Sequence, residues 1–369
     1  MTRARTNANV TAAVGRNMII NGAMNVAQRS ASVTGLGAAS GYFTCDRWQI
    51  ETGSSAGRFT MTQTADGPNG ISANCIKLDC TTADTSIAAS EHLILEQRLE
   101  GQNVQRIGKG VAGAKQITVS FYVKASASFT FGCELVDLDN SRQCAKLFST
   151  TTDWVRHELT FPADVDDGSS PFDDDNAGSL ALFFWLHAGT TFTGGTLNTA
   201  AFANNTNANR AAGIDSFYSN TDNNFFITGV QMEIGPVATE FEQEEISTTL
   251  AKCYRYFQVS GYLESSGVHR LVLSGNNGTA PLTGIKYPYT MRAAPTLNYF
   301  GGNSDGGSFT VYAPSRTQGT AQTSPSSATI GPQSTRWNFT SHADAAKDPH
   351  WIDVGTASSQ FGWTQDAEL

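Results

Sequence analysis

The stretch QITVSFYVK at residues 116–124 decides the fold class of this chain. Its β-branched and aromatic residues favour a central β-strand, and it is the clearest strand in the sequence. Similar segments at residues 129–135, 154–161 and 180–187 are separated by turn-rich stretches. This rhythm is typical of an antiparallel sandwich and differs from the alternation of strands and helices in βαβ units. We therefore expect a mostly β chain built around a jelly-roll β-sandwich.

The same pattern extends to both sides of this region. Strand-like segments precede it at residues 17–21, 46–50, 57–63 and 93–99, and the segment 225–234 closes the sandwich before a Gly-Pro pair. Trp48 and Trp154 lie in strand patterns and are predicted to fill the interior. The stretch 189–224 is too long for a plain connection unless it is functional or paired elsewhere, and mobile surface loops are the conservative interpretation.

A chain of 369 residues exceeds one ordinary hydrophobic core, so two domains are expected. We predict an N-terminal arm at residues 1–16, a jelly-roll domain at 17–245 and a connecting helix at 246–260. Leu250, Tyr254 and Phe257 recur there at helical spacing. Short strands at 268–273, 284–289, 296–300, 308–312 and 336–340 then predict a second, smaller β-sandwich domain at 261–369.

The composition disfavours several classes of partner. Only 15% of the residues are charged and the net charge is −9, which opposes binding to nucleic acid. No run of 18 apolar residues exists, so membrane insertion is not expected.

The six cysteines are scattered without a CxxC pair, which argues against a structural zinc site and favours buried free thiols. A disulfide within the pair Cys75 and Cys80, or within Cys133 and Cys144, is the alternative in an oxidising medium.

Several motifs occur in a fixed order: GRNMIINGAMNVAQR at residues 15–29, Tyr42, DRW at 46–48, VSFYVK at 119–124, FITGVQMEIGPVATEF at 226–241 and LAKCYRYF at 250–257. Together they resemble a family of bacteriophage tail fiber and virion fiber, or spike, proteins. The sandwich domain of that family is similar to carbohydrate-binding modules.

The resemblance implies a structural protein located on the virion, with a jelly-roll domain displayed on the particle. It further implies a helix-led C-terminal module that drives homotrimer assembly, and an N-terminal arm that docks to other virion proteins. The expected function is attachment to a host-surface glycan by weak, multiplied contacts. Attachment of the fiber to the tail or to the capsid stays open, and so do two alternatives: an architectural decoration protein without receptor binding, and a polysaccharide-degrading spike.

Aromatic side chains are the candidate ligand-binding residues, because a flat ring matches the C–H face of a hexose. The candidates are Phe217, Tyr218, Trp351 and Trp363. Trp351 and Trp363, together with Phe361, could instead pack at a subunit interface, where such residues are enriched.

The acidic run DVDDGSSPFDDD at residues 164–175 could supply carboxylate oxygens to a structural calcium ion, the one candidate cofactor. The alternative is a solvated acidic loop. The candidate ligands are Asp164, Asp166, Asp167, Asp173, Asp174 and Asp175.

No motif marks a catalytic residue, so the chain is not expected to be an enzyme. The six histidines are well separated, and neither HExxH nor GxSxG occurs. Six acidic residues could in principle form a glycosidase pair, but nothing in the sequence fixes their separation. They are Glu91, Glu96, Glu100, Glu134, Asp137 and Asp139.

Overall fold

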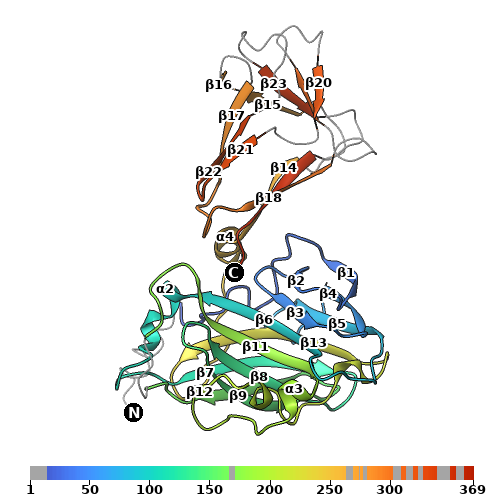
Figure 1. Cartoon of the computed structure of the whole chain (residues 1–369), viewed down its shortest axis with the longest axis vertical. Helices are drawn as coiled ribbons and strands as arrows, with labels where there is room; N and C mark the ends of the chain where they lie inside the picture. The colour runs from blue at the N-terminus through green and yellow to red at the C-terminus, as the bar shows by residue number, and fades with distance from the viewer. Residues whose placement is uncertain are drawn as a thin grey trace. The chain divides into compact units, whose positions relative to one another are not determined.

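The structure is a computed structural model, and it divides the chain into two compact units (Figure 1). The first unit ends at Leu250 and the second runs from Ala251 to Glu368. The structure describes residues 15–165, 171–262, 269–273, 275–276, 281–301, 309–312, 319–322, 327–338, 350–354 and 361–369. Most of the predicted N-terminal arm therefore lies outside the described residues.

The first unit is a jelly-roll sandwich of two antiparallel sheets. Sheet A contains, in spatial order, β1 (Ser32–Leu36), β4 (Arg58–Thr64), β5 (Cys75–Thr82), β13 (Asn224–Ile234), β7 (Ile117–Ala125) and β10 (Val155–Phe161). Sheet B contains β12 (Ala203–Asn204), β9 (Arg142–Ser149), β8 (Thr130–Asp137), β11 (Gly178–Ala188), β6 (His92–Glu100), β3 (Gln49–Gly53) and β2 (Gly41–Tyr42). The chain crosses repeatedly from one sheet to the other, which confirms the predicted fold class.

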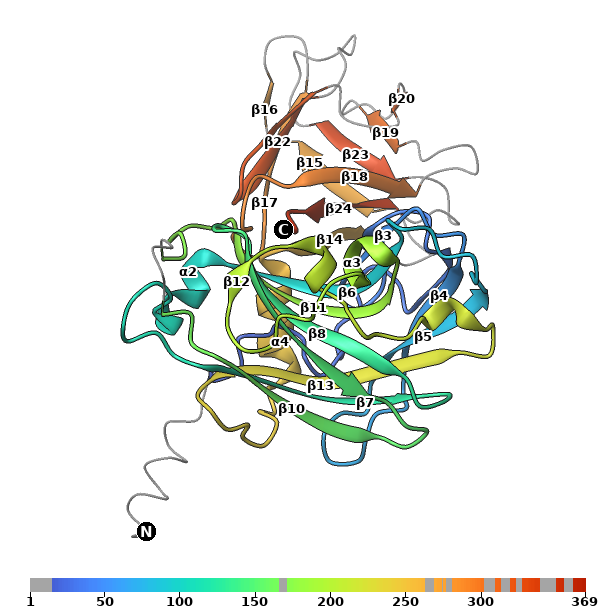
Figure 2. The same cartoon turned by 60° about the horizontal axis from the view of Figure 1, so that its bottom comes forward.

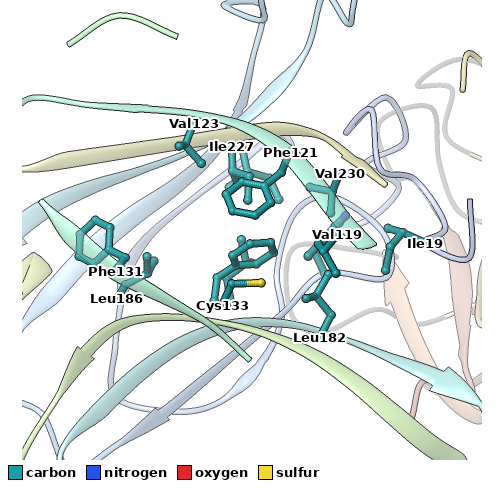
Figure 3. Packing of buried hydrophobic residues seen from close by; sticks show 14 of the residues in the cluster. Ile19, Val119, Phe121, Val123, Phe131, Cys133, Leu182, Leu186, Ile227 and Val230 are labelled. Atoms are coloured by element: carbon teal, nitrogen blue, oxygen red, sulfur yellow. The ribbon is translucent and has the colours of Figure 1, made fainter. Parts of the chain in front are cut away.

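The core fills the space between the two sheets. Val119, Phe121 and Val123 alternate along β7 and all point inward, toward Cys133, Leu182 and Leu186 of sheet B (Figure 3). The Phe121 ring meets Phe148 at 4.9 Å and Phe184 at 5.0 Å between centroids, both edge to face. Each such aromatic pair adds roughly 0.5–1.5 kcal/mol beyond the burial of its area.

The predicted strand at residues 17–21 is wrong, because this segment forms hydrogen-bonded turns. Met18 and Ile19 are buried, but the Asn17 side chain takes the place of a neighbouring strand. Its Oδ1 accepts N–H groups from Ile19 and Met232, both at 3.0 Å, and its Nδ2 donates to the Val230 carbonyl. The apolar pattern therefore reports burial correctly, while the side-chain amide replaces the backbone ladder.

Asn21 performs a similar role one turn later. It adopts a left-handed φ of 58° and is only 3% exposed. Its amide donates to the carbonyls of Val26 and Asp46 and accepts the Val26 N–H, while its own carbonyl accepts Trp48 Nε1 at 3.1 Å. The hydrogen bonds of Asn21 thus join the motifs 15–29 and 46–48 in the interior. Trp48 is a core residue, as predicted.

Trp154 is not a core residue, in contrast to the prediction. It is half-buried and its ring lies 6.3 Å from the ring of Phe226, with Lys124 Nζ 5.2 Å from the Trp154 centroid. It lies just before β10 begins, and Phe226 is outside the core cluster, with Lys77 and Lys124 Nζ 5.7 and 4.7 Å from its ring centroid. Alternation alone assigns a strand aromatic to one of two faces and does not say which face is inside.

A third layer covers the outer face of sheet B. Phe183 and Trp185 of β11 and Val136 of β8 form a second apolar cluster with Ala211. The Phe192 ring of the short helix α3 (Thr190–Thr193) packs 5.2 Å from Trp185. Figures 1 and 2 show α3 beside the strands of sheet B. The stretch 189–214 is therefore packed against the sandwich, and the interpretation of the whole of it as mobile loops is wrong.

The connecting helix is α4 (Ile246–Tyr254), which is shorter than the predicted segment 246–260. It ends because Phe257 begins β14 (Phe257–Tyr262). In the described part of the chain, no helix has the length and apolar character needed to cross a bilayer.

The second unit is the predicted smaller β-sandwich, and its described residues form three antiparallel sheets. Their strands are β14, β24 (Phe361–Asp366) and β18 (Thr296–Gly301); β15 (His269–Leu273), β23 (His350–Val354), β19 (Phe309–Tyr312) and β20 (Gly319–Gln322); and β16 (Gly275–Asn276), β17 (Pro281–Lys286), β22 (Ser334–Asn338) and β21 (Ser327–Ile330).

All six cysteines are free and buried, as the first interpretation of their spacing held. Cys75 and Cys80 lie on one strand, β5, and Cys133 and Cys144 lie on the paired strands β8 and β9 without a disulfide between them. Burial raises the pKa of the Cys75, Cys80 and Cys144 thiols to about 11, so these groups remain protonated at neutral pH.

We predict that Asn21→Ala lowers the free energy of unfolding of the first unit by about 3 kcal/mol. The substitution leaves the buried backbone groups that the amide binds without a partner, and it places an alanine at a positive φ that only the amide contacts made favourable. Denaturant unfolding followed by tryptophan fluorescence measures this. Asn21→Gly keeps the backbone freedom and removes only the hydrogen bonds, so it should lose less. Equal stability of Asn21→Ala and the parent chain would contradict the role given to the amide.

Candidate functional site

Phe217 and Tyr218, two of the predicted sugar-stacking residues, belong to the core. Both side chains are 0% exposed and both rings pack against Phe59, at 6.3 and 6.4 Å between centroids. Gly57 lies directly against the Tyr218 ring, where an added Cβ would come within 2.5 Å. No ring face is open to a ligand, so the assignment of these two residues as ligand-binding is corrected.

The two predicted tryptophans lie in the second unit. Trp363 in β24 is buried, with its ring 4.7 Å from and edge to face with Trp337 of β22. It packs in the interior of that unit, where its ring has no open face for a sugar to stack on. Trp351 lies in β23, and its side chain is outside the described residues.

The acidic run is divided between several environments. Asp164 is buried and paired with Arg142, while Asp173, Asp174 and Asp175 are exposed. Asp166 and Asp167 lie outside the described residues. Within the described ranges, no group of three or more His, Cys, Asp or Glu side chains is arranged to hold a metal ion. A calcium ion stays a prediction, and Asp164 is already neutralised by its arginine.

A polar pocket of about 480 Å³ opens at the β12–β9 edge of sheet B. Its volume lies within the range of about 300–1,000 Å³ typical of small-ligand sites. The buried lining residues are Arg142, Gln143 and Phe202, and the more exposed ones are Thr196, Leu197, Asn198, Ala203, Asn204, Thr206 and Asn209. Most of these residues come from the stretch 196–209, part of the long connection 189–224 that was interpreted as mobile surface loops unless functional or paired elsewhere.

Backbone pairing fixes this stretch to the edge of the sheet. Ala203 and Asn204 pair with Gln143 and Arg142 as the two-residue strand β12. Asn198 extends the contact, because its Nδ2 donates to the Gln143 carbonyl at 2.8 Å and its own carbonyl accepts the Ala145 N–H. The rim of the pocket is therefore held by main-chain hydrogen bonds and by the Asn198 Nδ2 group.

Asn209 closes the turn at the other side of the pocket. Its Oδ1 accepts the Thr196 N–H at 3.0 Å and lies where a Cβ at position 195 would be, only 2.1 Å away. Gly195 is required for this close approach. The Asn209 Nδ2 makes no hydrogen bond to the described residues, and an amide held by its oxygen presents that nitrogen to a ligand.

Gln143 carries the clearest sign of a missing partner. The residue is only 1% exposed, yet neither its Nε2 nor its Oε1 has a hydrogen-bond partner among the described residues. A buried amide without partners costs about 1–3 kcal/mol, so such groups are rare in native structures and point to a function or a bound molecule.

The one ionisable residue of the pocket lining is already neutralised. Arg142 forms a bidentate pair with Asp164, with both N–O distances at 2.9 Å, and its Nη2 also donates to the Phe202 carbonyl. This buried pair fixes the floor of the pocket without leaving a net charge there.

A second buried ion pair holds the layer that carries the pocket. Arg210 directs Nε and Nη2 at the Glu134 carboxylate, at 3.0 Å each, and its guanidinium lies 4.9 Å from the Trp185 ring centroid. Trp185 Nε1 also donates to Glu134 at 2.7 Å. Burial raises the pKa of Glu134, and the nearby Arg210 partly opposes that rise.

The remaining acidic candidates do not form a catalytic pair. Glu96 and Glu134 both pair in register with Phe183 from opposite sides of β11. Burial raises the pKa of Glu96 to about 7, but Glu96 contacts Arg98 at 3.0 Å and Glu134 is held by Arg210. Each carboxylate is bound by its own arginine under the third layer.

A Ser–His–Glu row also occurs in the structure. His187 Nδ1 lies 2.8 Å from Ser216 Oγ, and its Nε2 lies 3.4 Å from Glu91. Ser216 caps the turn η3 (Phe217–Ser219) by accepting the Tyr218 N–H, and the imidazole is 0% exposed. The row therefore ties that turn to β11 and β6, and we assign it no catalytic role.

We predict that Arg210→Ala destabilises the first unit by about 3 kcal/mol, since it leaves the Glu134 carboxylate buried without its cation. Amide hydrogen exchange should rise most at residues 196–211. The double variant Glu134→Gln/Arg210→Met removes both charges and should be milder. If hydrogen exchange at residues 196–211 is unchanged in Arg210→Ala, the ion pair between Arg210 and Glu134 does not hold this stretch in place.

A second prediction concerns pH. Burial lowers the pKa of His187, so the unfolded chain takes up a proton near pH 6.5 while the folded chain does not. Stability is therefore retained above about pH 6.5 and falls below it, by up to about 1.4 kcal/mol per pH unit. Burial lowers the pKa of His157 as well, so His187→Gln should flatten the slope between pH 5 and 6.5 only in part.

Glu96 acts in the opposite direction, because its raised pKa makes the folded chain lose stability as the pH rises from about 4.5 to about 7. Glu96 is present in both the parent chain and His187→Gln, so the difference between their free energies of unfolding at each pH isolates the contribution of His187. If the two free energies change in parallel between pH 5 and 6.5, His187 does not have the predicted effect.

No protein-family model and no curated protein matches the chain. Solved structures with similar folds include the carbohydrate-binding module CBM4, with 12% identity over 58% of this chain and 97% of that chain, at a TM-score of 0.30. The module TmCBM61 bound to β-1,4-galactotriose has 10% identity over 60% and 99%, at 0.30. A family 11 module from Clostridium thermocellum, bound to a mixed-linked tetrasaccharide, has 13% identity over 56% and 98%, at 0.27. At these values the likenesses assign no ligand or activity to this chain.

Proposed function

We propose that this chain is a non-catalytic carbohydrate-binding component of a phage particle, a fiber or spike that attaches to a host-surface glycan. The observation that carries the binding part is the buried, unpartnered amide of Gln143 in the lining of a polar pocket. The location on a virion, a homotrimeric assembly and an arm that docks to other virion proteins rest on the sequence motifs that resemble fiber proteins.

The chemistry of the pocket suits sugar hydroxyls. A hydroxyl group both donates and accepts, and a primary amide presents two N–H donors beside one carbonyl acceptor. Asn209 and Asn198 offer such groups, Asn204 adds an exposed amide at the rim, and the enclosed Gln143 amide has no protein partner among the described residues. Phe202 and Leu197 supply the apolar contact that the C–H face of a sugar needs.

The pairing of the buried glutamates with arginines favours binding without catalysis. The two glutamates with raised pKa values, Glu96 and Glu134, are each held by an arginine, and neither lines the pocket. A glycosidase requires two carboxyl groups at the scissile bond. Among the lining residues no carboxylate occurs, so the pocket is suited to holding a glycan and not to cleaving it.

We predict that the purified full chain binds the surface polysaccharide of its host and competes with particles for adsorption. Gln143→Met, which keeps the side-chain length and removes the amide, should weaken binding at least about tenfold, the effect of about one lost buried hydrogen bond. Surface plasmon resonance on immobilised polysaccharide measures the affinity.

Gln49→Met is the matched control, because Gln49 lies on β3 of the same sheet and its Oε1 is also buried without a partner. It should bind as the parent chain does. Loss of binding in neither variant would remove the pocket from the proposal. Failure of the parent chain to bind or compete would favour a decoration protein that cements the particle.

A further inference from the structure

We infer that the pocket at the β12–β9 edge selects a neutral sugar and discriminates against uronic and sialic acids. This inference rests on the proposed glycan-binding function and names the chemical class of its ligand. Three features carry it: the charge of the pocket lining, the polar groups of the lining that have no protein partner among the described residues, and the negative net charge of the chain.

The lining holds one cation, and that cation is already used. Arg142 donates hydrogen bonds from Nε and Nη2 to the Asp164 carboxylate, and Nη2 also donates to the Phe202 carbonyl. A guanidinium whose fork faces a buried carboxylate cannot offer a second bidentate contact to a ligand carboxylate. The floor is therefore electrically neutral, although it contains an arginine.

The next cation along the sheet does not replace it. Lys146 is four residues from Arg142 on β9, but it does not line the pocket. Its Nζ donates to the Thr199 carbonyl at 3.5 Å and lies 5.8 Å from the Phe161 ring centroid. A carboxylate entering the pocket would thus lose water without gaining a close positive charge, which is costly in a partly enclosed site.

The groups that remain without a protein partner are neutral amides, which carry both hydrogen-bond donors and an acceptor. Asn209 offers Nδ2 and Asn198 offers Oδ1 opposite its bonded nitrogen, and the enclosed Gln143 amide has no protein partner among the described residues. A pair of adjacent hydroxyls, or a hydroxyl beside an N-acetyl group, matches such a set because each can donate and accept. A carboxylate only accepts, so the amide oxygens would be left facing it unpaired.

The overall charge of the chain acts in the same sense. At a net charge of −9 the chain repels acidic polysaccharides at low ionic strength and leaves neutral ones unaffected. The short-range selection by the pocket and the long-range field therefore agree.

The test uses the full chain and matched sugar pairs: methyl glucoside against methyl glucuronide, methyl galactoside against methyl galacturonide, and N-acetylglucosamine against N-acetylneuraminic acid. Saturation-transfer NMR titrations at 20 and 300 mM NaCl give the affinities. We expect at least one neutral member to bind at least about tenfold more tightly than its acidic counterpart, with little effect of salt. Gln143→Met should abolish that preference by weakening the neutral member.

Two results overturn the inference, and they differ in their consequence for the proposed function. Equal or tighter binding of an acidic member, lost in Gln143→Met, would leave a glycan site and exclude the neutral selection. No binding of any probe, together with no binding to host polysaccharide, would remove the glycan site itself. Gln143→Glu separates the electrostatic part: it keeps the shape and adds a negative charge, so it should weaken acidic members further than neutral ones.

Discussion

The outer face of sheet B must be covered, and much of the first unit follows from this constraint. β11 carries the unbroken apolar run LALFFWL at residues 180–186, so it buries side chains on both of its faces. Leu182, Phe184 and Leu186 fill the sandwich core, while Ala181, Phe183 and Trp185 face the other way. Exposing two large aromatic side chains would cost several kcal/mol, roughly 1.5–3 for each. The stretch 189–214 supplies the cover, and its remaining polar residues form the pocket.

Buried ion pairs fix the position of this cover more than they add stability. Arg210 with Glu134 and Arg142 with Asp164 are both largely removed from water, and Arg142 also donates to the Phe202 carbonyl of the cover. Desolvation of such charges offsets much of their attraction, so a buried pair chiefly penalises arrangements in which the partners separate. In a layer rich in Thr, Asn, Ala and Gly, few apolar contacts define one conformation. The ion pairs supply the register that the side-chain packing does not.

The sequence predicted the strands that are long and apolar, because periodicity reports burial directly. β7, β8, β10, β11 and β13 lie where the pattern indicated them. β5 and β9 were missed. In β5 the apolar residues Ile76, Leu78 and Cys80 alternate with the charged residues Lys77 and Asp79, so the segment has one buried face and no continuous apolar run. Segment 17–21 was wrong for the opposite reason, since Met18 and Ile19 are buried while the Asn17 amide replaces the ladder.

The candidate site was harder to predict, because its signal is polar. Aromatic residues were taken as ligand contacts, yet Phe217 and Tyr218 are core residues, and a sequence does not say which aromatic faces outward. The pocket is instead lined mostly by polar residues of the stretch 196–209, which reach Arg142 and Gln143 only where β12 pairs with β9. The one available clue was negative: the stretch 189–224 was too long for a simple connection. A long connection without apolar periodicity, next to a strand that is apolar on both faces, indicates a covering layer.

The neutral floor also explains how a site of this kind could work on a particle. A pocket that recognises hydroxyl groups by a few amides gives weak binding, since each hydrogen bond replaces one to water and adds only about 0.5–1.5 kcal/mol. Such a site is useful where many copies act together, because linked weak contacts gain avidity by factors of about 10²–10⁴. An arginine free to bind anions would instead bind any acidic surface. Under the proposed function, the pairing of Arg142 with Asp164 would give up affinity at one site and gain discrimination against acidic surfaces.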